Sequence, residues 1–377
     1  MSKNAIRISE LVAVLILYEI GSTTLYLQGA KALQDAWAVM MIGACGGFLL
    51  LLMYLWIFRL DPRRDLFELC IHYLGKIAGG FIGLLFVGYF AYEASRVTRD
   101  LAELTALTLL DRTPLVAIVL MTLLVSYNDV RYGPKSVFLI TLTLLPIVAA
   151  GYIILLLLLS FSGRIQLEYI FPVLENGLLP VFNIAFPTSI TFPFGQVVIL
   201  LVFFRLLDAN RKQINKAVML TYGIVALILI LLNQLNIVVL GPKLAAMFTY
   251  PLLEVVRLIN IVRVFERLDV IFVLILFMGL GTKIVIFYTG AAIGFCRITG
   301  LKYKASVVLS GIIIFACSLF PANFTEYIWI GLNFTVIWVW PIFQFVLPLL
   351  LLLMMLIRKK KRQQQPEDAV PAAAERA

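Results

Sequence analysis

Charged residues are scarce in this chain. Asp, Glu, Lys and Arg make up 14% of its 377 residues, whereas 62% of the residues are hydrophobic. A soluble domain of this length cannot cover so much apolar surface, so the composition excludes a soluble protein and predicts an integral membrane protein.

Histidine and cysteine are also rare. His72 is the single histidine, and the four cysteines, Cys45, Cys70, Cys296 and Cys317, have no paired spacing. This pattern argues against a disulfide framework, a metal site and a cofactor. Because the sequence also has no phosphate-binding loop and no grouping of catalytic side chains, we expect no enzyme activity.

Apolar runs of about 20 residues, the length that spans a bilayer, recur along the chain. They lie at about 9–30, 36–58, 77–108, 114–130, 135–161, 180–207, 215–240, 268–296, 304–321 and 327–357. We therefore predict an all-α membrane protein with ten transmembrane helices in one domain, residues 1–362. The polar residues 363–377 are predicted to form a disordered cytoplasmic tail.

The distribution of positive charge gives the orientation. Most of the 31 Lys and Arg residues fall in loops on the same side as the N-terminus, and cytoplasmic loops carry such an excess. Both termini are therefore predicted to be cytoplasmic. The net charge of +10 follows from this topology, with attraction of Arg358–Arg362 to anionic membrane lipid as a second effect, and nucleic acid is not an expected partner.

The most informative stretch is Phe186–Gly195, where two prolines and a glycine interrupt an apolar run. Pro187 and Pro193 each remove a backbone donor and clash with the preceding turn, so a continuous helix cannot form there. Freed backbone groups are tolerated at membrane depth only where they are buried in protein or line water, so the break predicts a binding site. The alternative is a helix that the prolines only kink. The candidate site residues here are Pro187, Thr188, Ser189, Thr191, Phe194 and Gln196.

A second candidate break, Gly21–Thr24, lies about halfway along the first span. If the helix opens there, a half-helix beginning near Ser22, Thr23 and Thr24 presents free N–H groups and seats a carboxylate. In the alternative interpretation, the hydroxyl groups bond to carbonyls of their own intact helix. Two interrupted segments in corresponding halves are typical of an inverted-repeat binding site.

Lys283 lies near the middle of the eighth span, where a charge costs roughly 2.5–3.5 kcal/mol on insertion scales. It must face protein or water. Two roles stay open: a substitute for a bound sodium ion, or a structural ion pair with a carboxylate such as Glu19. The nearby Gly279 and Gly281 predict a close approach of another helix.

The third span carries several charges at helical neighbour spacings. Because the run 77–108 is longer than the hydrocarbon thickness of about 30 Å, we expect its charged end to emerge outside the bilayer. Those charges are Glu93, Arg96, Arg99, Asp100 and Glu103. Tyr92, nearer mid-depth, is a candidate for the binding pocket. In the tenth span, Asn333, Phe334, Trp338 and Trp340 are interpreted as packing or interface residues.

Several segments resemble a known family, the B subunits of Ger-type spore germinant receptors in the amino acid/polyamine/organocation transporter superfamily. The resemblance covers about residues 5–360 and is carried by Tyr89–Asp100, Pro193–Gln196, Tyr250–Pro251 and Phe265–Phe272. Gln196 stands where the family usually has Glu, and the glycine-rich opening of the first span is reduced to Gly21, Ser22 and Thr23.

This resemblance implies a leucine-transporter-type fold in which helices 1 and 6 are broken. Five helices, about 8–161, would be related to the other five, about 180–357, by a twofold pseudo-axis in the membrane plane. It also implies residence in the inner membrane of an endospore. The expected partners are a small nutrient, commonly an amino acid, together with receptor A and C subunits.

These observations lead to one hypothesis and two rivals. A germinant binds at mid-membrane, with its carboxylate near Ser22–Thr24, its amine near Thr188–Thr191, and its side chain among three aromatic rings. Those rings belong to Tyr92, Phe194 and Tyr288. The first rival is an amino acid permease coupled to protons through Lys283 or a carboxylate, and the second is a purely structural subunit.

Overall fold

Helices make up the protein almost entirely. The computed structural model describes residues 5–259 and 268–363, and within these residues no strand forms beyond the isolated pairing of Ile6 with Leu207. The tail at 364–377 and residues 265–267 of the family segment lie outside the described residues.

The elements follow the apolar runs of the sequence, with short 3-10 and π segments at the breaks. In chain order they are α1 (Ile8–Thr23), η1 (Ala30–Asp35), α2 (Ala36–Leu60), α3 (Leu66–Leu74), α4 (Lys76–Thr108), α5 (Leu115–Val130), α6 (Pro134–Phe161), η2 (Leu167–Ile170), α7 (Leu178–Ala185), α8 (Thr188–Thr191), η3 (Phe194–Ile199), α9 (Leu200–Phe203), η4 (Phe204–Leu206), α10 (Arg211–Leu240), α11 (Pro242–Met247), α12 (Pro251–Arg257), α13 (Leu268–Thr299), α14 (Tyr303–Leu319), α15 (Phe324–Ile328), η5 (Trp329–Val339), η6 (Ile342–Val346) and α16 (Leu347–Gln363).

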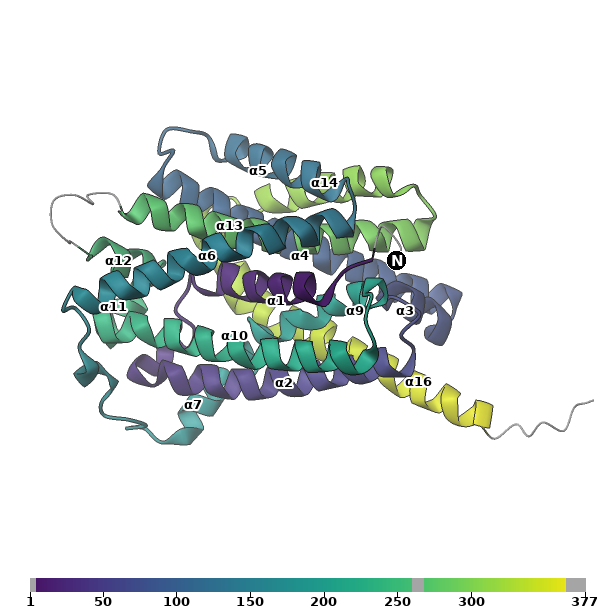
Figure 1. The fold of residues 1–377 in the computed structure, drawn as a ribbon, viewed down its shortest axis with the longest axis horizontal. Helices are drawn as coiled ribbons and strands as arrows, with labels where there is room; N and C mark the ends of the chain where they lie inside the picture. The colour runs from purple at the N-terminus through teal and green to yellow at the C-terminus, as the bar shows by residue number, and fades with distance from the viewer. Residues whose placement is uncertain (1–4, 260–267, 364–377) are drawn as a thin grey trace, which may run out of the picture.

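Seven helical segments in the described residues are long and apolar enough to cross a membrane. Two shorter apolar helices, α5 and α14, and the 16-residue α1 account for the remaining predicted spans. The chain is thus a multi-pass membrane protein, and the count of ten stays a prediction. The N-terminus and the end of α16 lie at the same end of the bundle, as an even number of spans requires (Figure 1).

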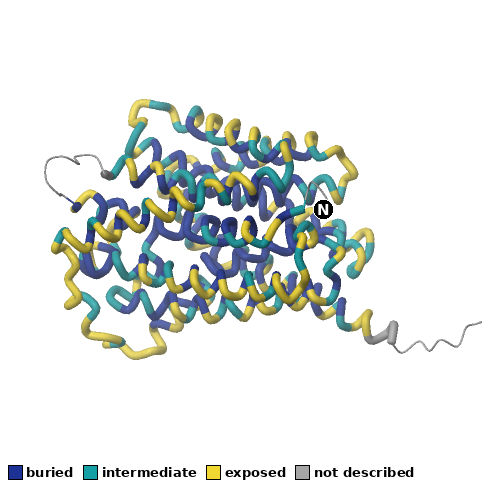
Figure 2. Tube along the Cα trace, viewed as in Figure 1, coloured by how far each residue is buried: buried dark blue, intermediate teal, exposed yellow. Residues whose placement is uncertain are grey.

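The core of the bundle surrounds α1. This helix packs against α13 and α6 on one side and against α10 on the other (Figure 1). Figure 2 shows buried residues running through the middle of the molecule and exposed ones on the outer helices. The exposed side chains of α5 include Leu120, Met121 and Leu124, which suits a surface that faces lipid.

The connecting helix α3 begins with a capping box. Asp65 accepts the backbone N–H of Glu68, and the Glu68 side chain accepts the backbone N–H of Asp65 in return. The helix buries Phe67 and Leu69 against the bundle and packs on α4. This short helix therefore lies against the bundle between α2 and α4.

One close backbone approach in the core involves the glycines predicted from the sequence. A Cβ atom added to Gly21 would lie 2.5 Å from the carbonyl oxygen of Gly279, whereas one added to Gly281 would meet nothing within 4 Å. The prediction is confirmed for Gly279 and wrong for Gly281, because Gly281 lies on a different face of α13.

We predict that Gly279→Ala lowers the apparent unfolding temperature in mild detergent. The added methyl group would lie 2.8 Å from the Cα of Gly21, and such overpacking costs about 1–3 kcal/mol. Gly281→Ala, two residues away, is the matched control. It should unfold at the wild-type temperature or above, since alanine favours a helix by about 1 kcal/mol. Equal unfolding temperatures for the two variants would contradict the close α1–α13 contact.

Candidate functional site

The first interruption is the C-terminal end of α1. Ser22 and Thr23 are helical, and the hydroxyl groups of Thr23 and Thr24 donate to the carbonyl oxygens of Glu19 and Ile20 at 2.6 and 3.1 Å. The next helical segment, η1, begins only at Ala30. The predicted half-helix beginning near Ser22–Thr24 is therefore wrong in polarity, because this end presents carbonyl groups rather than N–H groups.

The second interruption is a succession of short turns. Phe186 and Phe192 are extended, and each is followed by a cis proline. The Thr191 hydroxyl group lies within hydrogen-bonding distance of the carbonyl oxygens of Pro187, Thr188 and Val336, at 3.1, 3.0 and 3.3 Å. The predicted break is confirmed, and Thr191 partners carbonyl groups that a continuous helix would have bonded internally.

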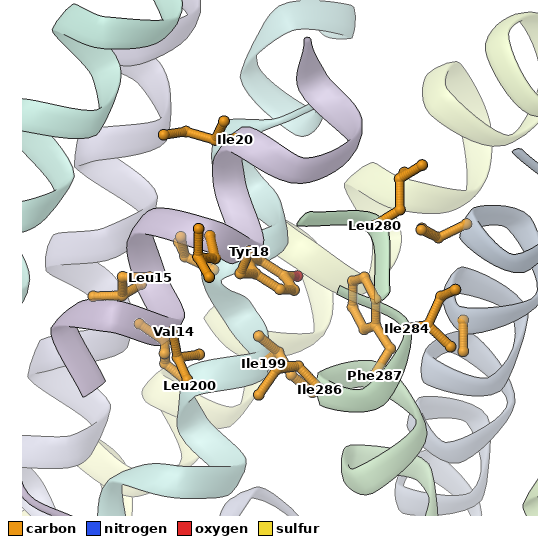
Figure 3. Close-up of a cluster of buried hydrophobic side chains, with 14 of the residues drawn as sticks. Val14, Leu15, Tyr18, Ile20, Ile199, Leu200, Leu280, Ile284, Ile286 and Phe287 are labelled. Atoms are coloured by element: carbon orange, nitrogen blue, oxygen red, sulfur yellow. The ribbon is translucent and has the colours of Figure 1, made fainter. Parts of the chain in front are cut away.

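Lys283 joins the two interruptions. Its ammonium group donates to Ser22 Oγ at 2.8 Å and lies 5.0 Å from the ring centre of Tyr18 and 5.3 Å from that of Phe192. The side chain is completely buried. Apolar side chains of α1, α13 and residues 199–200 fill the space beside the Tyr18 ring (Figure 3). Hydrogen bonding and cation–π contact thus stabilise a charge that lipid could not.

Glu19 lies one turn before Ser22 and is also buried. Neither of its carboxylate oxygens has a hydrogen-bond partner, and among the described residues no ion pair links it to Lys283. The predicted direct pairing is therefore not formed in this conformation. A buried carboxyl group without a partner is costly, which makes Glu19 a candidate contact for a ligand or water.

A second polar group surrounds Glu93 on α4. Glu93 accepts hydrogen bonds from Gln196 Nε2 at 2.6 Å and from the indole N–H of Trp340. The backbone carbonyl of Gln196 accepts the Tyr18 hydroxyl at 2.9 Å, which connects this group to α1. Trp340 in turn contacts the Phe192 ring at 5.4 Å. One continuous network therefore runs between α1, α4, the broken segment, α13 and the last span.

Three members of this network were not predicted: Tyr18, Glu93 and Trp340. We expected Glu93 to emerge outside with its neighbours, and we interpreted Trp340 as a packing residue. Both are at most 2% exposed, and Arg96, Arg99 and Asp100 are also buried. The available signal was the spacing of Tyr89, Glu93, Arg96 and Asp100, which places four polar side chains on one face of α4.

The three rings predicted to hold a ligand side chain are not brought together. The Tyr92 hydroxyl lies 2.9 Å from the Thr335 hydroxyl. Phe194 packs on the ring of Tyr222, whereas the Tyr288 hydroxyl donates to the carbonyl of Val307 on α14. Ser189 packs closely against α2 at Gly43, and Pro187 and Thr188 are half-buried. The rings that do surround the site are those of Tyr18, Phe192 and Trp340. Spacing alone could not give these directions, because they depend on helix packing.

Backbone and ion-pair contacts close the end of the bundle where the N-terminus lies. The backbone of Ile6 donates to Leu206 and accepts from Asp208, both at 2.9 Å. Arg297 donates to Asp65 at 2.9 Å, beside a cavity of about 230 Å³. Burial raises the pKa of the Asp65 carboxyl, while the Glu68 N–H and the Arg297 charge act in the opposite direction. These contacts hold together the segments at this end of the bundle.

Solved structures with the same arrangement are membrane transporters. The chain is similar to Mhp1, a nucleobase-cation-symport-1 family transporter, in a closed conformation with bromovinylhydantoin bound; the TM-score is 0.64 at 14% identity, covering 86% of this chain and 76% of that one. An inward-facing structure of Mhp1 gives 0.57 at 16% identity, with 95% and 78% covered. The predicted leucine-transporter-type fold is confirmed.

Sequence comparison agrees with this fold. A family model described as spore germination protein matches residues 5–327. Spore germination protein KB of Bacillus subtilis (strain 168) is 30% identical over 352 residues, covering 93% of this chain and 94% of that protein. Spore germination protein A2 of the same organism is 28% identical over 300 residues, with 76% and 78% covered. Fold and family together indicate a germinant receptor or permease-like role. The polar network thus lies in a transporter fold, and the chain belongs to the spore germination protein family.

Proposed function

We propose that this chain is the B subunit of a spore germinant receptor. It binds a small germinant, most simply an amino acid, at mid-membrane and signals to receptor A and C subunits. It resides in the inner membrane of the endospore with both termini on the core side. The family and the transporter fold support this assignment.

The observation that carries the proposal is the position of Lys283. A completely buried ammonium group contacts both interrupted segments at once, so its surroundings change if either segment moves. A ligand that competes for this ammonium group can therefore shift the packing of α1 against the broken segment.

The geometry revises how a zwitterionic ligand would lie. Its carboxylate fits the Lys283 ammonium group rather than a helix N-terminus. Its amine fits the unpartnered Glu19 carboxylate and the carbonyl end of α1, where the helix dipole is negative.

The energies are sufficient for a switch. Each hydrogen bond to a charged group contributes about 1.5–3 kcal/mol. Shifting a two-state equilibrium from 1:99 to 99:1 requires about 5.5 kcal/mol of differential binding. Two such contacts made in only one conformation would approach that value.

We predict that Lys283→Met weakens germinant binding about 10- to 100-fold. The variant keeps an unbranched side chain one atom shorter than lysine and removes one charge-assisted hydrogen bond. A thermal-shift screen of amino acids, sugars and nucleosides on the purified chain identifies the ligand, and titration then gives both dissociation constants. Thr282→Val is the control, because the Thr282 hydroxyl donates only to its own helix at Met278. Wild-type affinity in folded Lys283→Met would refute the proposed site.

A permease remains the second candidate because Glu19 is a buried carboxylate without a partner. Such a group can take up and release a proton during transport. Under this alternative the chain would carry an amino acid with protons across the membrane.

Uptake by reconstituted liposomes separates the two functions. We expect the chain to bind the screened ligand without concentrating it inside the vesicles, since a receptor needs no net flux. Concentrative uptake driven by a pH gradient, and abolished in Glu19→Gln, would instead establish the permease. Vesicles without protein and vesicles without a pH gradient are the controls.

A further inference from the structure

A closed ring of side chains lies on the outer side of the polar network. Four aromatic rings contact one another in series: Tyr26 to Tyr250 at 5.8 Å, Tyr250 to Phe324 at 6.5 Å, and Phe324 to Tyr327 at 6.2 Å between ring centres. Asp100 closes the series, since it accepts the hydroxyl groups of Tyr26 at 2.6 Å and Tyr327 at 2.5 Å.

The members of this ring come from four separate parts of the chain. Tyr26 follows α1, Asp100 belongs to α4, Tyr250 precedes α12, and Phe324 and Tyr327 belong to α15. The two hydrogen bonds to Asp100 therefore join segments that no helix holds together. Asp100 is 3% exposed, and the guanidinium groups of Arg96 and Arg99 lie 5.4 and 5.9 Å from the Tyr327 ring centre.

A cavity of about 490 Å³ adjoins the ring, and Tyr26 and Phe324 belong to both. Thr249, Thr325 and apolar side chains complete its lining, and no charged side chain contributes. Asp100 lies two helical turns, about 10 Å, beyond Glu93 along α4. Tyr26 lies four residues after Ser22, and this displacement runs in the same direction as the one from Glu93 to Asp100. The ring thus separates the cavity from the network that includes Glu93 and Lys283.

We propose that this ring is the outer gate of the small-molecule site and that Asp100 is its latch. The cavity holds a solute before the gate opens. Opening requires the Tyr26 and Tyr327 hydroxyl groups to leave Asp100, and the Tyr327 hydroxyl to leave the carbonyl of Arg96 as well, so that the segment after α1 and the start of the last span can move apart. The gate serves the function proposed above, but its test needs no ligand.

The test measures access of a small thiol-reactive reagent to position 22. Ser22→Cys is made in a background in which Cys45, Cys296 and Cys317 are replaced by alanine, and the protein is studied in lipid nanodiscs. Native Cys70, which is 1% exposed on α3, is kept to report loss of the fold. We expect slow labelling at position 22 when the gate is intact. Tyr26→Phe and Tyr327→Phe should each raise that rate at least about tenfold, because each removes a hydrogen bond to the latch. Asp100→Asn should also raise it, because the amide oxygen accepts the two hydroxyl groups without the charge that strengthens both bonds.

Tyr152→Phe is the matched control. The Tyr152 hydroxyl lies 3.0 Å from the Thr24 hydroxyl, so it also binds the end of α1, but from α6 rather than from the ring. It should leave the labelling rate unchanged. Parent-like rates in all three gate variants would overturn the proposal, as would equal acceleration at position 22 and Cys70, which reports unfolding. If the gate variants change the labelling rate as expected but the chain binds no ligand, the proposed function is contradicted and the gate is not.

Discussion

The structure depends on one constraint, a positive charge buried at the centre of an apolar bundle. An isolated ammonium group at this depth is unfavourable by several kcal/mol. Lys283 is accommodated because one hydroxyl group and two aromatic faces meet it, from Ser22, Tyr18 and Phe192. Tyr18 and Ser22 lie one turn apart on α1, close to its end at Thr23, and Phe192 meets the ammonium group from the point where the sixth span opens. The break in the sixth span and the buried charge are therefore linked.

Helix polarity contributes to the same arrangement. The carbonyl end of α1 carries partial negative charge and lies beside Ser22, so the dipole favours the Lys283 ammonium group. A helix N-terminus at this place would repel it. The close contact of Gly21 with Gly279 brings α1 and α13 near enough for the Ser22–Lys283 bond. The sign of charge that this site accommodates therefore depends on which end of α1 faces the core, as well as on the side chains.

The sequence predicted the parts that local chemistry decides. Pro187 and Pro193 cannot continue a helix, and Lys283 cannot face lipid, so the break and the buried charge followed from residue type. The direction of the α1 end could not be predicted, because Gly-Ser-Thr-Thr suits the end of one helix as well as the start of another. Glu93 and Trp340 were missed for a different reason. Because the third span is longer than the bilayer is thick, its charges could be placed outside the membrane without any partner. Only tertiary packing places Trp340 against Glu93.

The two closed ends of the bundle differ in how they are held. At the end where the N-terminus lies, Ile6 pairs by its backbone with Leu206 and Asp208, Lys135 pairs with Glu10, and Arg297 pairs with Asp65, so five elements must separate together. At the opposite end, Asp100 accepts the hydroxyl groups of Tyr26 and Tyr327, the Tyr327 hydroxyl also contacts the carbonyl of Arg96, and Gln28 and Asn233 are joined by two hydrogen bonds. Ion pairs between elements therefore help to hold one end, whereas hydrogen bonds between the segment after α1, α4, α10 and α15 hold the other.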